Sequence, residues 1–175
     1  MMAGARTIRT GLIVGLIAYA AVALFYSAFD LLAARGSLYT VDLLGKAVFR
    51  GLRDPAVLQF PIARDPQAIF MYNGLHLVFS LIIGLIVAGM IVHAERAPSQ
   101  GLIVLLAIVA GGIITVFLVG YLTESMRALL PWWSIVIANV LAALLAGAYL
   151  LYTRPGLWRR LTGGVPPATV LARKG

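Results

Sequence analysis

The stretch GLIVLLAIVAGGIITVFLVGYL, residues 101–122, contains no charged side chain. An α-helix rises about 1.5 Å per residue, so about 20 apolar residues cross a hydrocarbon layer of about 30 Å. Three further apolar stretches have this length: residues 10–33, 69–92 and 131–152. The sequence therefore predicts an all-α integral membrane protein, an antiparallel bundle of four transmembrane helices.

The composition supports this fold class and excludes several kinds of chemistry. Of 175 residues, 62% are hydrophobic and only 11% are charged, too few to cover the surface of a soluble domain. This length suits a single membrane domain spanning residues 1–175. The absence of cysteine excludes disulfides, thiolate catalysis and cysteine-ligated metals.

The N-terminus has some features of a secretory signal. Arg6 and Arg9 precede an apolar run that contains Ala18-Tyr19-Ala20, a sequence typical of a cleavage site. The apolar run continues to Ala34, well past the point where a signal peptide would end. We expect an uncleaved first helix, with a cleaved signal as the alternative.

The basic residues of the chain, which has a net charge of +8, flank the apolar stretches. This pattern favours anionic lipid headgroups as partners and argues against nucleic acid. Four spans place both termini on one side, together with Arg6, Arg9, Arg96 and the basic tail, residues 153–175. The other side would hold Arg35, Lys46, Arg50, Arg53, Arg64 and Arg127. A narrow excess of basic residues predicts a multi-pass protein of the bacterial inner membrane with cytoplasmic termini.

The long connection between the first two spans contains an amphipathic segment, residues 40–53. One face of this predicted helix carries Val41, Leu44, Val48 and Leu52. The opposite face carries Asp42, Lys46, Arg50 and Arg53. We expect an interfacial helix lying on the lipid with its apolar side down; packing against a partner subunit is the alternative.

Six polar residues are predicted to lie in the half of the bundle nearest this long loop. They are Tyr26, Asp30, Asn73, His76, Glu124 and Asn139. Polar side chains are costly inside a membrane, so each requires a partner or a role. The favoured interpretation is hydrogen bonding between helices. The alternative is a site for a quinone, a lipid or another amphiphile, or for protons, with Asp30, His76 and Glu124 ionisable and the others orienting.

Cofactor signatures are incomplete. A bis-histidine haem needs histidines that face each other, but His76 and His93 are 17 positions apart on one predicted helix, about 25 Å. Haem ligation through His76 with another residue type, or across a dimer, is disfavoured but left open. The zinc spacing H-x-x-x-H and the glycine-rich nucleotide motifs are absent, so we predict no cofactor. The motif Gly11-x-x-x-Gly15 indicates close helix packing or dimerisation.

The sequence thus predicts a non-catalytic polytopic membrane protein. We expect an accessory or assembly subunit of a larger inner-membrane complex, bound to another membrane protein or to a second copy of itself. Its many small residues, suited to helix packing, and its lack of any catalytic motif favour this role. The polar site described above is the alternative function.

Overall fold

The computed structural model describes residues 2–162, and that part of the chain contains helices and no strand. The elements in chain order are α1 (Met2–Leu32), α2 (Tyr39–Phe49), α3 (Pro66–Arg96), α4 (Gly101–Leu122), α5 (Trp132–Thr153) and α6 (Leu157–Leu161). Two short 3-10 turns, Pro98–Gln100 and Glu124–Met126, precede α4 and follow it.

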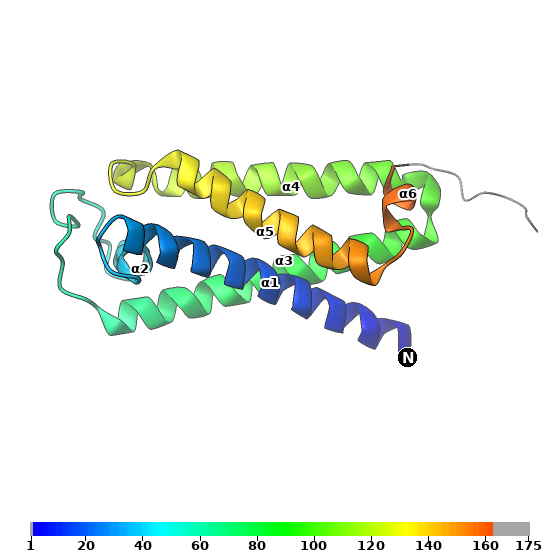
Figure 1. Cartoon of the computed structure of the whole chain (residues 1–175), viewed down its shortest axis with the longest axis horizontal. Helices are drawn as coiled ribbons and strands as arrows, with labels where there is room; N and C mark the ends of the chain where they lie inside the picture. Colours follow the sequence, from blue (N-terminus) through cyan, green and yellow to red (C-terminus); the bar gives the residue numbers. More distant parts are fainter. Residues whose placement is uncertain (1, 163–175) are drawn as a thin grey trace, which may run out of the picture.

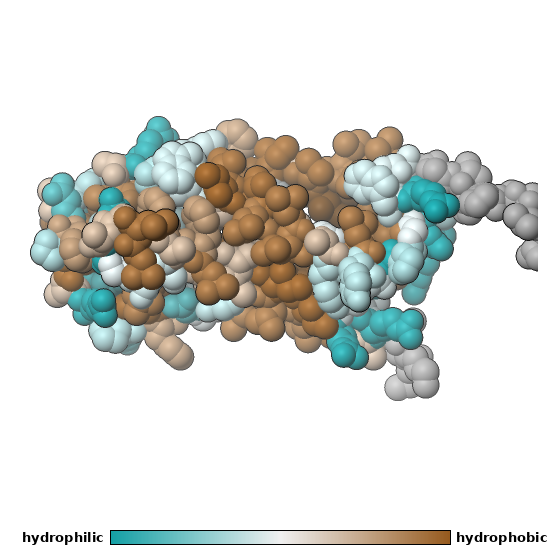
Figure 2. Space-filling view, in the orientation of Figure 1, coloured by the Kyte–Doolittle hydropathy of each residue, from teal (hydrophilic) through white to brown (hydrophobic). Residues whose placement is uncertain are grey.

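The four long helices, α1, α3, α4 and α5, are long and apolar enough to cross a membrane, which confirms the predicted fold class. They run along the long axis of the molecule, with α2 at one end and α6 at the other (Figure 1). A hydrophobic band covers the middle of the visible face, and hydrophilic residues gather at the two ends (Figure 2). Both α1 and α3 have 31 residues and extend beyond the predicted spans, because their polar ends continue the helix outside the apolar stretch.

Helix α1 contacts both α3 and α5, and its contact with α3 is the most extensive between two elements of the described chain. Gly11 and Gly15 of α1 face Ser80 and Gly84 of α3. A Cβ added at Gly15 would lie 2.6 Å from the Leu81 Cα, and one at Gly11 would lie 2.7 Å from the Leu85 Cα. The predicted Gly11-x-x-x-Gly15 motif therefore serves close packing within the chain, where only glycine lets the two backbones approach this far.

Helix α2 confirms the predicted helix in the long loop but is oriented differently from the expectation. Part of its charged face lies against the protein: Asp42 is 1% exposed and Lys46 is 8% exposed, whereas Arg50 is exposed. On the predicted lipid-facing side, Val48 is exposed as expected, but Leu44 is buried in the protein. Helix α2 packs on α3, where Gly45 leaves no room for a Cβ against the Ala68 backbone. Asp42 and Lys46 can be buried at little cost, because the segment leading into α3 supplies polar partners for both side chains.

The first part of the predicted basic tail, residues 153–175, contains a short helix. Residues 157–161 form α6, which packs against α3, α4 and α5 and buries Leu157 and Leu161. The remainder of the predicted basic tail, 163–175, lies outside the described residues. The short helix follows Gly156, whose φ of +84° lets the chain reverse after α5.

Candidate functional site

A polar cluster between α1 and α3 contains two of the six candidate site residues. The Tyr19 hydroxyl donates to Asn73 Oδ1 over 3.3 Å. The His76 ring packs beside Tyr19, with ring centroids 5.2 Å apart, and beside Tyr72 at 6.4 Å. Asn73 and His76 project from the same side of α3 because they are three positions apart. Tyr19 thus joins both residues across the helix interface.

Two other candidates, Tyr26 and Asp30, form separate contacts nearer the loop. The Tyr26 and Ser134 hydroxyls lie 3.5 Å apart, linking α1 to α5 at the long limit of a hydrogen bond. The Asp30 carboxylate accepts hydrogen bonds from the Thr40 backbone N–H at 2.7 Å and from the Thr40 hydroxyl at 2.6 Å. Asp30 is 1% exposed, so this carboxylate joins the end of α1 to the start of α2.

The remaining candidates, Asn139 and Glu124, have local partners. Asn139 Nδ2 donates to the Ile135 carbonyl, one turn earlier in α5, over 2.8 Å. Glu124 lies in the turn after α4, where it is 3.5 Å from Arg127, and both side chains are more than half exposed. In the described chain, the polar contacts of these two residues do not reach the Tyr19 cluster.

His76 differs from the other candidates because its ring nitrogens have no hydrogen-bond partner among the described residues. Its contacts are the two tyrosine rings, and the residue is half-buried. An imidazole carries both a donor and an acceptor nitrogen when neutral. These nitrogens therefore remain available to another polar molecule.

The six candidates omit four residues that complete these contacts: Tyr19, Tyr72, Ser134 and Thr40. Tyr19 precedes the candidate Tyr26 by seven positions, two helical turns, which places both on one face of α1. Tyr72 precedes His76 by four positions, a helical spacing that places both on one face and could have identified it. Ser134 and Thr40 carry no comparable signal, because their partners Tyr26 and Asp30 are brought to them only by the tertiary fold.

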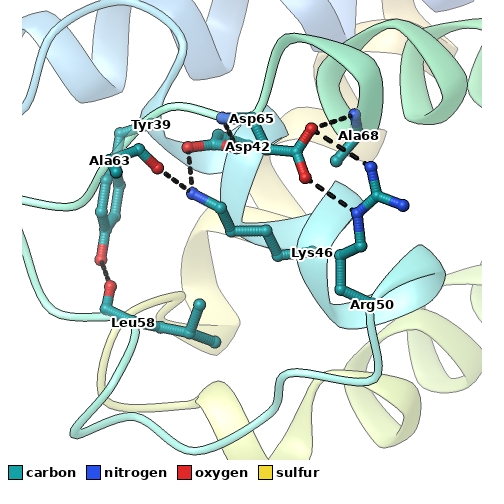
Figure 3. A network of polar contacts seen from close by, with 8 residues as sticks. All are labelled: Tyr39, Asp42, Lys46, Arg50, Leu58, Ala63, Asp65 and Ala68. Atoms are coloured by element: carbon teal, nitrogen blue, oxygen red, sulfur yellow. Dashed lines mark hydrogen bonds and ion pairs between the residues drawn. The ribbon is translucent and has the colours of Figure 1, made fainter.

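A second polar network holds α2 against the start of α3 (Figure 3). The Lys46 ammonium donates to Asp42 Oδ2 at 2.7 Å and to the Ala63 carbonyl. Asp42 Oδ1 in turn accepts the Asp65 backbone N–H at 3.1 Å. Asp65 caps α3 by accepting the Ala68 N–H at 3.0 Å, the role expected of an aspartate before Pro66. Every charge in this network has a partner within the chain, which is typical of a structural role.

The ion pair between Arg50 and Asp65 allows a test of this network by titration. The Arg50 guanidinium, 2.8 Å away, together with the Ala68 N–H, lowers the pKa of Asp65 to about 2. Because the pKa of Asp65 is lower in the folded chain than in the unfolded chain, where it is about 4, the ionised carboxylate stabilises the fold. This stabilisation is fully present above about pH 4 and is lost as the pH falls through about 2.

We expect Arg50→Gln to raise the pKa of Asp65 above about 2, yet leave it below its ordinary value of about 4, because the Ala68 N–H still binds the carboxylate. The measurement is an NMR titration of the Asp65 carboxyl carbon in micelles. Arg53→Gln removes an exposed arginine of the same loop and should leave the titration unchanged. An unchanged Asp65 midpoint in Arg50→Gln would contradict the assignment.

The geometry around the histidines bears on metal and haem binding. His76 and His93 both belong to α3, and His93 Nε2 lies 2.6 Å from Gln100 Oε1 at the far end of that helix. Within residues 2–162, no three His, Asp or Glu side chains are grouped so that they could hold a metal ion. The two histidines therefore do not meet within one chain.

Comparison with known proteins does not assign a family. No protein-family model, no curated protein and no solved structure matches this chain.

Proposed function

We propose that the chain is a non-catalytic accessory or assembly subunit of a larger complex in the bacterial inner membrane, with both termini cytoplasmic. Three of the six polar candidates, Tyr26, Asp30 and Asn73, have side-chain partners on another helix, which supports a packing role for them. The orientation is supported by a narrow excess of basic residues, since eight of the fourteen lie on the terminal side of the spans in the sequence and six on the other side.

The observation that carries the proposal is the sparse packing of α4. Only Gly101, Val104 and Gly120 are buried in this helix, and all three lie near its ends. Its middle exposes a small-residue face made of Ala107, Ala110 and Gly111. A Cβ added at Gly111 would meet open space. Small residues let membrane helices approach closely, so this face suits a helix of another membrane protein.

Extraction in a mild detergent tests the proposal, with proteins that co-purify identified by mass spectrometry. We expect a defined partner with the unaltered chain and its loss with Gly111→Leu, because a leucine would hold the partner backbone away. Gly74→Leu is the matched control, since Gly74 is exposed on α3 and also faces open space. A monodisperse monomer without a co-purifying protein would contradict the subunit role.

His76 favours a second candidate function, the binding of a quinone, a lipid or another amphiphile beside Tyr19 and Tyr72. Its unpartnered ring nitrogens could bond to a polar group of such a ligand, while the flanking rings contact the apolar part. The same detergent preparation tests this candidate when its small molecules are also analysed. An amphiphile present with the unaltered chain and absent with His76→Phe would support it.

A further inference from the structure

A cavity of about 740 Å³ lies at the terminal end of the bundle, between α1, α3 and α5. Four arginines line it: Arg6 and Arg9 from α1, Arg96 from α3 and Arg154 from α5. Glu95 is the one acidic residue in its lining. The cavity is thus strongly basic, and its volume lies within the range typical of small-ligand sites.

The single acidic group is already engaged. Arg154 Nη1 lies 2.5 Å from Glu95 Oε2, and Arg160 donates to the Glu95 backbone carbonyl at 3.3 Å. Among the described residues, no carboxylate pairs with Arg6, Arg9 or Arg96. Arg6, Arg9 and Arg96 are exposed, so water and salt screen their charges from each other, and all three remain free to bind an anion at the cavity.

The position of the cavity indicates where such an anion would come from. Arg6 and Arg9 precede the apolar part of α1, and Ile13 and Val92 line the same cavity on its membrane side. Ile13 is seven residues from Arg6, a rise of about 10 Å along the helix. This end of the molecule is where the hydrophobic band gives way to hydrophilic residues, beside the start of α1 (Figures 1 and 2). The cavity therefore lies at the level of the lipid headgroups.

We propose that this cavity binds the phosphate group of an anionic phospholipid. Arginine forms paired, charge-assisted hydrogen bonds with phosphate oxygens, and Arg9 and Arg96 approach the cavity from different helices. The Tyr149 hydroxyl is a further polar group in the lining, whereas the Thr10 and Thr153 hydroxyls donate to the Arg6 and Tyr149 carbonyls of their own helices. The acyl chains extend along the apolar surface beyond Ile13 and Val92. The bound lipid bridges α1, α3 and α5 near the point where Gly11 and Gly84 let α1 and α3 pack closely. This inference does not depend on the subunit role proposed above.

Native mass spectrometry of the detergent-purified chain tests the site, with phosphatidylglycerol and phosphatidylcholine as lipid probes. We expect phosphatidylglycerol to be retained in preference to phosphatidylcholine. The double variant Arg9→Gln/Arg96→Gln should bind phosphatidylglycerol about tenfold more weakly, or weaker still. The reason is that each arginine near the lipid surface contributes appreciably to attracting an anionic headgroup. Inorganic phosphate is the soluble probe and should not compete at concentrations where the lipid is bound.

The control double variant, Arg53→Gln/Arg159→Gln, removes the same charge from two exposed arginines outside the cavity lining. It should retain phosphatidylglycerol, and both double variants should keep the helical circular dichroism of the unaltered chain. Equal loss of lipid in the two double variants would overturn the site in favour of general charge attraction. Equal retention of the two lipids would also overturn it, as would displacement of the lipid by inorganic phosphate.

Discussion

Replacing Gly84 with valine is expected to lower the free energy of unfolding by about 3 kcal/mol or more, a cost at the upper end of that for overpacking. A Cβ at Gly84 would overlap the Gly11 carbonyl oxygen and the Gly15 backbone nitrogen. These neighbours are backbone atoms of α1, so no side-chain rotation can relieve the overlap. The two helices must separate, and α1 would lose its most extensive contact. Unfolding by sodium dodecyl sulfate in mixed micelles, followed by tryptophan fluorescence, measures the change.

Gly89→Val is the matched control for this prediction. Gly89 lies five positions further along α3, is exposed, and has open space where a Cβ would be added. The same substitution there should change the unfolding free energy little, because valine meets no neighbour within the chain. If the two variants unfold at the same detergent composition, the close approach of α1 and α3 contributes nothing to stability.

Hydropathy alone predicts the membrane spans well, because the thickness of the bilayer imposes a minimum length on each apolar helix. Residues 101–122 coincide with α4, and 131–152 differ from α5 by one residue at each end. The larger differences are at the ends of α1 and α3, where polar residues such as Arg6 and Glu95 continue the helix outside the lipid. Local hydrogen bonds and caps determine where these helices begin and end, and a hydropathy pattern contains no information on either.

The orientation of α2 was not predictable from its own pattern. The alternation of Val41, Leu44 and Val48 with charged residues indicates an amphipathic helix, but it does not say which side meets lipid, water or protein. The decisive partners, Ala63 and Asp65, lie in a segment without regular structure. The hydrophobic pattern of α2 alone therefore cannot predict these two partners.

The contacts of the six polar candidates were likewise only partly predictable from the sequence. Shared depth, inferred from the rise per residue, was the only basis for grouping residues of different helices. Asn73 and His76 do meet around Tyr19, whereas Asp30 binds Thr40 and Tyr26 meets Ser134. Depth along the membrane does not specify the rotation of each helix about its axis, and that rotation decides which side chains make contact.

The buried ion pair between Asp42 and Lys46 leads to the second prediction of large effect. The Asp42 side chain is 2% exposed and that of Lys46 is 11% exposed, at a separation of 2.7 Å. A buried pair gains little overall, because desolvation offsets the attraction, but removing one partner leaves a charge that neither protein nor water compensates. The Ala63 carbonyl would remain as a partner for Lys46, although it carries no full charge.

Asp42→Leu is therefore expected to destabilise the chain by about 3 kcal/mol, at the lower end of the cost of breaking a buried pair. Adding Lys46→Met should recover part of this loss, since the double variant buries no unpaired charge. Both values come from detergent-induced unfolding of the purified protein. Glu124→Leu is the control, because it removes one partner of an exposed pair, 3.5 Å from Arg127, and should cost less than about 1 kcal/mol. A double variant as unstable as Asp42→Leu would show that lost packing or the lost hydrogen bond from the Asp65 N–H, rather than an unpaired ammonium, causes the effect.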